Sequence, residues 1–297
     1  MQQSDLPAWV HVHPRETLTE RGLWASASRG QNFLVPSDAL DRIVEEAQVR
    51  ADETVLEIGT GLGRLTVRLA LHARSVVSVE LDGGLYEVAR TRLGDRRNIA
   101  LLNCDFLESK HRINPDVTES CRRALEGVER PLKVVSNLPY SISSPALANL
   151  LEWELEPAHL YVTLQEEVGD RITAAPGSED YGPLTVYVNY WARCEVLFPL
   201  GRGLFWPMPA VSSLFLHVRR RPERERTERY PLFAATVRKL FTSRRKTVGR
   251  ALRLAWDRET AEKILSAVGV DPELRVESLR TGDFEAIAAA APGPPGD

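Results

Sequence analysis

A short segment, Asn137-Leu138-Pro139-Tyr140, carries side chains suited to handling an aromatic amine. An aryl amine is a poor nucleophile because its lone pair is delocalised into the ring, and two hydrogen-bond acceptors facing its hydrogens favour a more tetrahedral nitrogen. The Asn137 side-chain oxygen and the Leu138 carbonyl could be those acceptors, while Pro139 fixes the turn and lacks a competing N–H donor. Tyr140 offers a flat face on which an unpaired base can stack. These four residues are the candidate catalytic residues, although such a tetrapeptide in isolation would be read as an ordinary turn.

A glycine-rich segment, Glu57 to Gly63, follows a predicted strand and precedes a predicted helix. Its glycines, among them Gly59 and Gly61, let the backbone turn tightly and let a ligand approach without a side-chain clash. Glu80 ends the next predicted strand, 21 residues after Gly59, where a carboxylate can accept hydrogen bonds from both hydroxyls of a ribose. Asp105 lies just past the third predicted strand, where it could meet the amino group of an adenine ring.

The spacing of these glycines separates two kinds of cofactor. The segment has the pattern GxGxG, whereas dinucleotide-binding proteins have GxGxxG, and Arg64 occupies the place of their third glycine. A pyrophosphate needs close packing at the helix N-terminus, which that third glycine permits. S-adenosylmethionine has no phosphate, so the shorter pattern suffices for it. We therefore expect S-adenosylmethionine, with a nicotinamide-dependent dehydrogenase as an alternative.

Strands and helices alternate between residues 54 and 218, which predicts an α/β fold with a mostly parallel, doubly wound sheet. The predicted strands are apolar or β-branched runs at 54–58, 75–80, 99–102, 133–136, 160–164 and 213–218. The first predicted helix opens at Pro36-Ser37-Asp38 and runs to residue 47. The others lie at 65–70, 85–93 and 146–151, with one more near 120–125 inside a long connection, 108–130. Ligands bind at the carboxyl ends of the strands in such sheets, so both candidate segments should meet there.

The chain divides into four predicted parts. Residues 1–28 show no clear period and are expected to form an extended N-terminal arm, and residues 29–220 form the cofactor-binding α/β domain. A charged run at 219–226 resembles a solvated linker, and residues 221–291 have the periodicity of a small all-helical domain. The tail at 292–297 is rich in proline and glycine and should be disordered.

Composition narrows the class of protein. The 297 residues are 43% apolar, which is ordinary for a globular chain, and no apolar run approaches the roughly 18 residues that span a membrane. The N-terminus lacks the features of a signal peptide, so a cytoplasmic location is expected. The three cysteines are widely spaced and predict reduced thiols, and the histidines show no metal-ligand spacing, so no metal is expected.

Charge is unevenly distributed along the chain. The net charge of −3 argues slightly against a nucleic-acid partner when the chain is taken whole. Between residues 236 and 255, however, there are seven basic residues and no acidic one. Because distribution matters more than the sum, this stretch leaves a nucleic-acid contact open, with a solvated helix face as the alternative.

These motifs together resemble those of the ribosomal RNA adenine dimethyltransferase family, which includes the bacterial KsgA enzymes, their eukaryotic relatives and the Erm resistance methyltransferases. The resemblance extends from about residue 24 to residue 290. It rests on the N-terminal motif 30–34, the glycine-rich segment, Glu80, Asp105, the segment 137–145, and the motifs 165–168 and 181–184. It implies a Rossmann-like class I methyltransferase fold. The motifs at 241–247 and 278–284, and Leu138, favour the KsgA branch over Erm, which usually has isoleucine at that place.

The resemblance also implies roles for particular residues. The cofactor-binding residues would be Gln31, Asn32, Leu34, Gly59, Gly61, Glu80, Asp105 and Asn137. The residues binding the target RNA would be Tyr140, Phe205, Arg244, Arg245 and Lys246, with Phe205 as a second stacking face for the flipped base. The aromatic, proline-rich loop 205–213 departs from the family, which usually has Lys at the place of Ala210 and Asp at that of Ser212.

The activity that this resemblance implies is conversion of two adjacent adenines in the RNA of the small ribosomal subunit to dimethyladenine. The sequence leaves the oligomeric state open, and a monomer is expected. Each base would receive two methyl groups in turn and would have to be unstacked first. Three alternatives remain: an Erm-like enzyme of large-subunit RNA, an adenine methyltransferase of DNA, and a non-catalytic assembly or transcription factor with the same fold. The presence of Glu80, Asp105, Asn137 and Tyr140 argues against the non-catalytic alternative.

Overall fold

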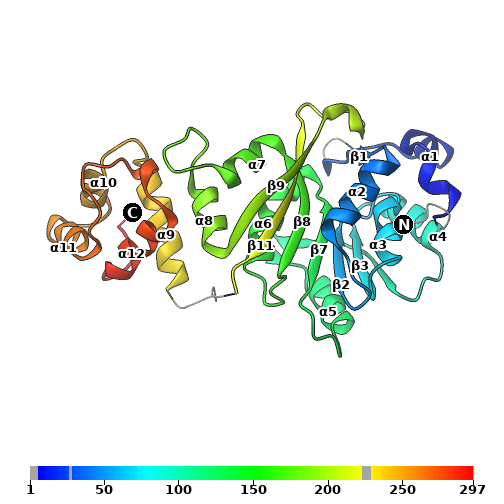
Figure 1. The fold of residues 1–297 in the computed structure, drawn as a ribbon, viewed down its shortest axis with the longest axis horizontal. Helices are drawn as coiled ribbons and strands as arrows, with labels where there is room; N and C mark the ends of the chain where they lie inside the picture. Colours follow the sequence, from blue (N-terminus) through cyan, green and yellow to red (C-terminus); the bar gives the residue numbers. More distant parts are fainter. Residues whose placement is uncertain (1–5, 27–28, 223–228, 297) are drawn as a thin grey trace. The chain divides into compact units, whose positions relative to one another are not determined.

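Two units make up the protein, and a computed structural model describes its residues 6–26, 29–222 and 229–296 (Figure 1). The first unit comprises residues 1–169 and 195–220, and the second comprises residues 170–194 and 221–297. The part of the chain that the model describes has no helix that is both long enough and apolar enough to cross a membrane.

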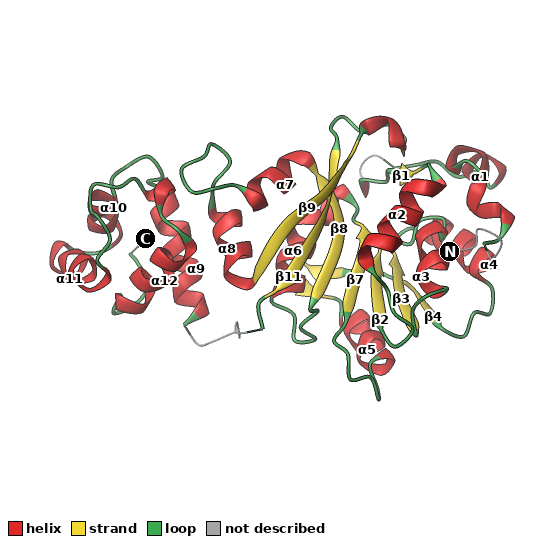
Figure 2. Ribbon diagram, in the orientation of Figure 1, coloured by secondary structure: helices red, strands yellow, loops and turns green. Residues whose placement is uncertain are grey.

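A seven-stranded sheet forms the centre of the first unit, in the order β4-β3-β2-β7-β8-β11-β9 (Figure 2). The strands from β4 to β8 pair in parallel, and β11 pairs antiparallel with β8. The strands are β2 (Thr54–Ile58), β3 (Ser75–Glu80), β4 (Ile99–Asn103), β7 (Lys133–Asn137), β8 (His159–Gln165), β9 (Ala192–Leu200) and β11 (Ser213–Arg220). The predicted mostly parallel sheet is confirmed.

Helices cover both faces of this sheet, with α2 on one face and α6 on the other (Figure 2). Every residue of β2 is buried, as expected for a strand covered on both sides. The described helices of this unit are η2 (Ala8–His11), α1 (Pro14–Glu20), α2 (Ser37–Ala47), α3 (Arg64–Ala70), α4 (Gly83–Leu93), α5 (Pro115–Ala124), η4 (Tyr140–Ile142), α6 (Ser143–Leu151) and η5 (Arg202–Leu204). A further helix, α7 (Glu166–Thr173), contributes residues to both units.

Two short ribbons complete the first unit. β1 (Phe33–Leu34) pairs antiparallel with β10 (Phe205–Trp206), so that two segments far apart in sequence lie side by side. β5 (Leu107–Ser109) pairs with β6 (Arg112–Ile113) at the start of the long connection, which then forms α5. The helix predicted near 120–125 is therefore longer than expected and begins earlier.

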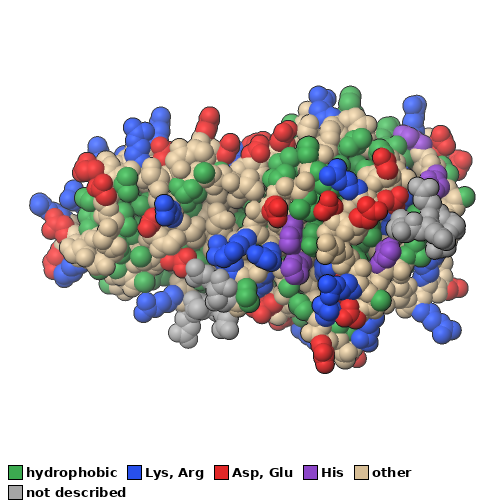
Figure 3. All heavy atoms as spheres, viewed as in Figure 1, with side chains coloured by type: hydrophobic (Ala, Val, Ile, Leu, Met, Phe, Trp, Pro, Cys, Tyr) green, Lys and Arg blue, Asp and Glu red, His purple; other side chains and the backbone are tan. Residues whose placement is uncertain are grey.

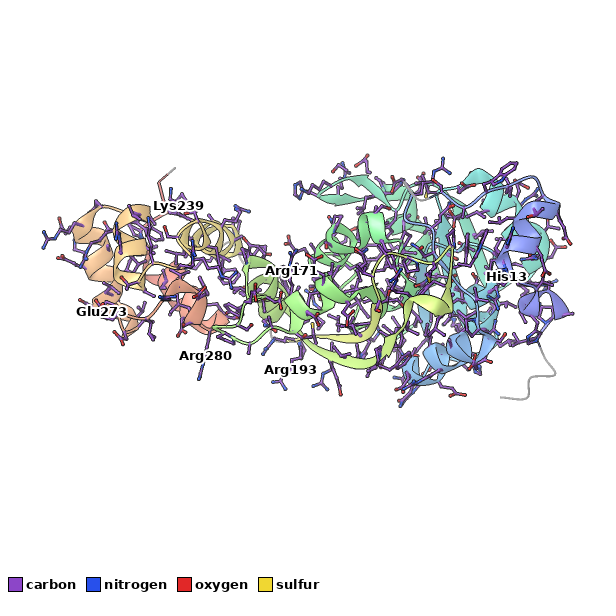
Figure 4. All side chains as sticks on the ribbon, turned by 90° about the horizontal axis from the view of Figure 1, so that it is seen from above. His13, Arg171, Arg193, Lys239, Glu273 and Arg280 are labelled. Carbon is purple, nitrogen blue, oxygen red and sulfur yellow. The ribbon has the colours of Figure 1, made fainter. Side chains whose placement is uncertain are left out.

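The N-terminal arm differs from its prediction, because it is partly helical rather than extended. Pro14 begins α1, where its missing N–H costs nothing, and the Nδ1 of His13 accepts a hydrogen bond from the Arg15 amide at 3.1 Å. The ring of His13, labelled in Figure 4, packs edge-on against Trp206 with centroids 5.9 Å apart. Residues 1–5 and 27–28 of the predicted arm lie outside the described residues.

Helices dominate the second unit. They are α8 (Pro183–Trp191), α9 (Tyr230–Phe241), α10 (Val248–Ala255), α11 (Arg258–Val268), η6 (Val276–Ser278) and α12 (Thr281–Ala290). An aromatic cluster forms part of its core, in which the ring of Tyr190 stacks on Phe233 with centroids 4.6 Å apart. The helices predicted for residues 221–291 are thus present.

Two predicted boundaries differ from the structure. Segment 170–194 groups with the C-terminal helices rather than with the sheet, because the hydroxyl of Tyr181 donates to the Leu279 carbonyl at 2.6 Å and α8 packs on α9 and α12. The tail is also ordered as far as residue 296. Its Gly296 amide donates to the Ala255 carbonyl at 2.9 Å, and the indole of Trp256 donates to the Gly293 carbonyl at 3.3 Å.

Candidate functional site

A pocket opens at the carboxyl ends of β2, β3 and β7 in the first unit. These strands are adjacent and parallel, so their last residues meet at one edge of the sheet. The pocket is lined by Arg29, Gly30, Gln31, Asn32, Phe33, Ile58, Gly59, Gly61, Val79, Glu80, Leu81, Leu85, Cys104, Asp105, Phe106, Asn137, Leu138, Pro139, Tyr140, Ser141 and Ile142. It brings together the glycine-rich segment and the Asn137–Tyr140 segment, as predicted.

The glycine-rich loop needs its glycines for two separate reasons. Gly59 and Gly61 have φ values of 86° and 55°, which side-chain-bearing residues rarely adopt. A Cβ on Gly59 would also lie 3.0 Å from the Cγ of Pro139, so the loop and the candidate catalytic turn approach each other more closely than most residues would allow. The loop is held to β3 by the Gly59 amide, which donates to the Val79 carbonyl at 2.8 Å.

Glu80 lies at the end of β3 and is buried. Its carboxylate accepts hydrogen bonds from the Gly61 amide at 2.8 Å and from the Asp82 amide at 2.9 Å. Burial raises the pKa of Glu80, and these two amides partly oppose that rise. The carboxylate is therefore oriented by backbone groups at the edge of the pocket, in a place suited to accept hydrogen bonds from ribose hydroxyls.

A second acidic residue lies beneath the loop. Glu57 is 1% exposed, and its carboxyl group accepts from Thr66 Oγ1 at 2.5 Å and from Ser78 Oγ at 2.6 Å. The Ser78 hydroxyl also lies 2.6 Å from that of Thr60, inside the glycine-rich loop. Burial raises the pKa of Glu57 to about 8, so its carboxyl group is largely protonated at neutral pH.

Asp105 follows β4 at the far side of the pocket. Its Oδ1 accepts from the Leu107 amide at 2.9 Å, which fixes the orientation of the carboxylate. Cys104 beside it also lines the pocket, and burial raises the pKa of its thiol. The three cysteines are unpaired, in agreement with the expectation of reduced thiols.

The N-terminal motif 30–34 divides between the pocket and the core. Gln31 and Asn32 line the pocket as predicted, and a Cβ on Gly30 would lie 2.7 Å from the Ser141 amide nitrogen. Leu34 does not line the pocket. Its side chain is 4% exposed and belongs to the apolar core, opposite Phe205 in the β1–β10 ribbon.

Arg29 connects the two sides of the pocket. Its carbonyl accepts a hydrogen bond from Ser141 Oγ at 3.0 Å on the side of the candidate catalytic turn. Its guanidinium forms an ion pair with Asp82, which lies two residues after Glu80 and caps the N-terminus of α4. Motif reasoning did not identify Arg29, because neither its type nor its position belongs to a recognised pattern.

Asn137 carries an unsatisfied acceptor. Its Nδ2 donates to the Asn32 carbonyl at 3.1 Å, which orients the amide so that Oδ1 faces the other way. Oδ1 is buried and has no hydrogen-bond partner among the residues that the structure describes. A buried acceptor without a partner is costly, so it indicates a site for a donor from a ligand. The adjacent Leu138 is almost fully buried and also lines the pocket.

Tyr140 lies at the mouth of the pocket. It begins η4, and its Oη lies 2.5 Å from Ser213 Oγ, at the start of β11. Burial raises the pKa of Tyr140, so the phenol remains neutral around neutral pH. The ring can therefore serve as an uncharged stacking surface.

Phe205 is not in the pocket in this structure. Its side chain is 3% exposed and packs in the same apolar core as Leu34. Its predicted role as a second stacking face would require the β1–β10 ribbon to rearrange, and it stays a prediction.

The basic motif lies in the second unit, and its members differ in their contacts. Arg244 is held internally: its guanidinium pairs with Glu277 at 3.0 Å and donates to the carbonyls of Ser178 and Glu179 at 2.9 and 2.6 Å. Arg245 and Lys246 are exposed beside it. Lys239, on the preceding helix α9, is labelled in Figure 4. On the face drawn in Figure 3, basic and acidic side chains are interspersed, consistent with a small net charge.

Arg64 has a structural role that the glycine pattern did not predict. Its guanidinium donates to the carbonyls of Val10, Leu34 and Val35 at 2.8, 2.7 and 2.8 Å. Burial lowers its pKa to about 10, which leaves it charged at neutral pH. The residue that replaces the third glycine of dinucleotide-binding proteins therefore joins the arm and β1 to the helix behind the glycine-rich loop.

The amino-acid sequence matches a family model described as ribosomal RNA adenine dimethylase over residues 25–291. The chain belongs to this family. It is 38% identical over 264 residues to a protein named ribosomal RNA small subunit methyltransferase A from Caldanaerobacter subterraneus subsp. tengcongensis, covering 88% of this chain and 95% of that protein. A protein of the same name from Bacillus mycoides is 34% identical, covering 93% and 94%.

Solved structures agree with the fold of this methyltransferase family. A dimethyladenosine transferase from Plasmodium falciparum has a TM-score of 0.71 at 20% identity, covering 84% of this chain and 94% of that one. The 23S rRNA methyltransferase ErmE has a TM-score of 0.64 at 28% identity, covering 87% and 98%. The class I methyltransferase fold predicted from the sequence is thereby confirmed.

Proposed function

We propose that this protein transfers methyl groups from S-adenosylmethionine to the exocyclic amino group of adenine, and that its targets are two adjacent adenines in the RNA of the small ribosomal subunit. The observation that carries the chemistry is the Oδ1 atom of Asn137. This residue lines the pocket, and its Oδ1 is buried without a partner among the described residues. The choice of RNA rests on the names of relatives that are 34–38% identical over most of the chain.

The residues of the pocket suit S-adenosylmethionine. The turn at Gly59 and Gly61 leaves room for close approach of a ligand, and Glu80 offers a fixed carboxylate for the ribose. Asp105 would meet the adenine ring of the cofactor, and Gln31 and Asn32 would line its methionine end. When bound, S-adenosylmethionine supplies an activated methyl group on a positively charged sulfur.

The residues of the chain then have to hold and orient the target amine. Asn137 Oδ1 and the Leu138 carbonyl would accept hydrogen bonds from its two hydrogens and direct its lone pair toward the methyl group. Tyr140 would stack on the flipped base, and Pro139 would keep the turn rigid. The nitrogen would bond to the methyl carbon as the bond from that carbon to sulfur breaks, with the electron pair going to sulfur, which leaves uncharged. The nitrogen, now positively charged, would lose a proton to water, so a strong base is not required. The gain comes mainly from positioning.

Repeated transfer follows from the same arrangement. After the first methylation the nitrogen keeps one hydrogen, and either acceptor can still hold it while the lone pair is presented again. The pocket must therefore accept a base that already carries one methyl group. We propose that both transfers use Asn137 and Tyr140 in the same roles.

RNA outside the target base would be held by the second unit. Arg245 and Lys246 are exposed and adjacent, so they can contact phosphates, whereas Arg244 is engaged with Glu277. Such contacts make RNA affinity depend on salt concentration. We further propose that the protein acts as a monomer in the cytoplasm without a metal ion.

A methyl-transfer assay with three substrates tests this function. Labelled S-adenosylmethionine is incubated with the protein and with undermethylated small ribosomal subunits, large subunits or duplex DNA, and the Asn137→Ala variant serves as control. We expect dimethyladenine in small-subunit RNA alone. Label in large-subunit RNA would support the second candidate, an activity like that in the name of ErmE, which has a TM-score of 0.64. Cofactor binding without label in any substrate would support a non-catalytic role.

A further inference from the structure

A hydrogen bond links Tyr140, the candidate stacking residue, to Ser213, for which the sequence assigned no role. The Oη of Tyr140 and the Oγ of Ser213 are 2.5 Å apart, although 73 positions separate them in the sequence. Ser213 is fully buried, and Tyr140 is half-buried at the edge of the pocket. The contact therefore lies inside the protein rather than on its surface, and water competes weakly for it.

Ser213 is held rigidly by the sheet. It is the first residue of β11 and pairs with Gln165 in the antiparallel ladder with β8. The backbone beside it is bonded as well, because the Glu166 amide donates to the Ser212 carbonyl at 3.0 Å. The hydroxyl of Ser213 thus projects from backbone that cannot shift easily, which makes it a fixed point for a partner.

Tyr140 needs such a fixed point because its own backbone holds only one end of the side chain. The residue lies in the three-residue helix η4, beyond the end of β7. A tyrosine ring can turn about two side-chain torsions, and stacking on a base demands one ring plane. With the Cα held by the turn and the phenol oxygen held by Ser213, the ring is fixed at both ends.

The link also spans the sheet. In the strand order β7-β8-β11, the Asn137–Tyr140 segment leaves β7, and Ser213 begins β11 on the other side of β8. Asn137 pairs with Thr163 on β8, and Gln165, two residues further on, pairs with Ser213. The strand β8 therefore positions both Asn137, which carries one acceptor for the target amine, and Ser213, which anchors the stacking ring.

We propose that Ser213 is a positioning residue for the methyl-transfer reaction, which it serves by holding the Tyr140 ring in the plane that stacks on the target adenine. This inference rests on the proposed function. It assigns a role to Ser213, the last residue of the loop 205–213, where the sequence suggested a role only for Phe205.

Three variants test the link from both ends. Ser213→Ala removes one partner, Tyr140→Phe removes the other while keeping the ring, and the double variant removes both. We expect each single variant to lower kcat/KM for RNA about tenfold, as the loss of one buried hydrogen bond would, and the double variant to be no worse than either. Ser212→Ala is the matched control from the same segment, and it should stay within about twofold of the unaltered protein.

Two further readouts separate positioning from a general loss of structure. The dissociation constant of S-adenosylmethionine should stay unchanged in Ser213→Ala, because Ser213 does not line the cofactor pocket. The ratio of monomethyladenine to dimethyladenine should rise in Ser213→Ala and in Tyr140→Phe, because a loosely held platform seats the base less well for the second transfer. If Ser213→Ala fails to fold, Tyr140→Phe still measures the same hydrogen bond.

The outcomes distinguish this inference from the proposed function. If Tyr140→Ala abolishes activity while Ser213→Ala and Tyr140→Phe remain within twofold of the unaltered protein, the inference is overturned and the stacking role stands. Multiplying effects in the double variant would also overturn it, because the two groups would then act independently. If Tyr140→Ala is itself fully active, the stacking role in the proposed function fails.

Discussion

Among single residues, Asn137 has the most direct connection to the proposed chemistry. Its Nδ2 donates to the Asn32 carbonyl, so its Oδ1 is held in a defined orientation, buried and without a partner among the described residues. The same atom would be one of two acceptors for the target amine. The geometry of Asn137 therefore depends on the N-terminal motif as well as on its own turn.

Replacing Asn137 by alanine should affect transfer much more than binding. We expect Asn137→Ala to lower kcat about 100-fold or more, roughly the effect of losing one transition-state hydrogen-bonding group, while the dissociation constant of S-adenosylmethionine changes little. Single-turnover methylation and calorimetric titration measure the two quantities. Near-normal turnover in this variant would contradict the assigned mechanism.

Glu57 gives a prediction about pH. Burial raises its pKa to about 8 in the folded protein, above the value of 4.5 for an unperturbed carboxyl group, so between these two values the folded state binds more protons than the unfolded state. The free energy of unfolding should therefore fall as pH rises from about 5 to 8, and buried Glu80, whose pKa is also raised, contributes with the same sign. Urea unfolding at a series of pH values measures the dependence.

The matched variant for this effect is Glu57→Gln, whose side chain keeps an acceptor for Thr66 and Ser78 but has no proton to lose. We expect the fall in the free energy of unfolding with pH to become shallower in this variant. An unchanged dependence would show that other groups cause it.

At the scale of elements, the loop 176–182 and η6 are joined by Arg244. The Glu277 amide donates to the Arg244 carbonyl, and the Gly177 amide donates to the Glu277 carbonyl. The guanidinium of Arg244 donates to the Glu277 carboxylate and to the Ser178 carbonyl. The basic motif therefore combines one structural residue with two exposed ones. This division of roles could not be read from three consecutive positive charges.

We expect substitutions in this motif to separate into two classes. Arg244→Ala should lower Tm by several degrees, because about 1–3 kcal/mol is lost when partly buried acceptors lose their donor. Arg245→Ala and Lys246→Ala should leave Tm unchanged but weaken RNA binding, each reducing the slope of log affinity against log salt by about one. Thermal unfolding and filter binding at several salt concentrations measure these effects. The reverse assignment, with stable Arg244→Ala and unstable Arg245→Ala, would refute the division.

At the scale of the whole molecule, the chain enters the second unit twice. Segment 170–194 contributes α8, whose Trp191 is 1% exposed, and its Tyr187 hydroxyl donates to the Ala234 carbonyl at 2.9 Å. A cut in the linker near residue 220 therefore does not separate two self-contained domains. It removes the helices that cover the aromatic side chains of α8.

Truncation after Arg220 should accordingly give a protein that is poorly soluble and melts at a lower temperature, because buried aromatic residues such as Trp191 and Tyr181 become exposed. A second variant, in which a short glycine–serine linker also replaces residues 170–194, should be more soluble than the simple truncation. Soluble yield and Tm of the two variants decide the point. Equal behaviour of the simple truncation and the full chain would contradict this description of the unit.

Several features of the fold and site could be predicted from the sequence because they depend on local patterns. Apolar runs that alternate with helical segments predict the strands that carry Gly59, Glu80 and Asn137. The carboxyl ends of parallel strands meet at one edge of the sheet, so these three residues must lie near one another. The requirement for glycine at positions 59 and 61 is likewise local, since it arises from backbone torsions. These local patterns are enough to predict that the cofactor loop and the candidate catalytic turn lie close together.

Only the tertiary structure decided which side chains face the pocket and which segments belong together. Leu34 and Phe205 belong to family motifs, yet their pairing across the β1–β10 ribbon buries both in the core. Arg244 belongs to the basic motif, but its guanidinium forms an ion pair with Glu277. The hydroxyl of Ser213 forms a hydrogen bond with that of Tyr140, two strands away in the sheet. Each of these facts depends on contacts between residues far apart in sequence, which local propensity and spacing do not encode.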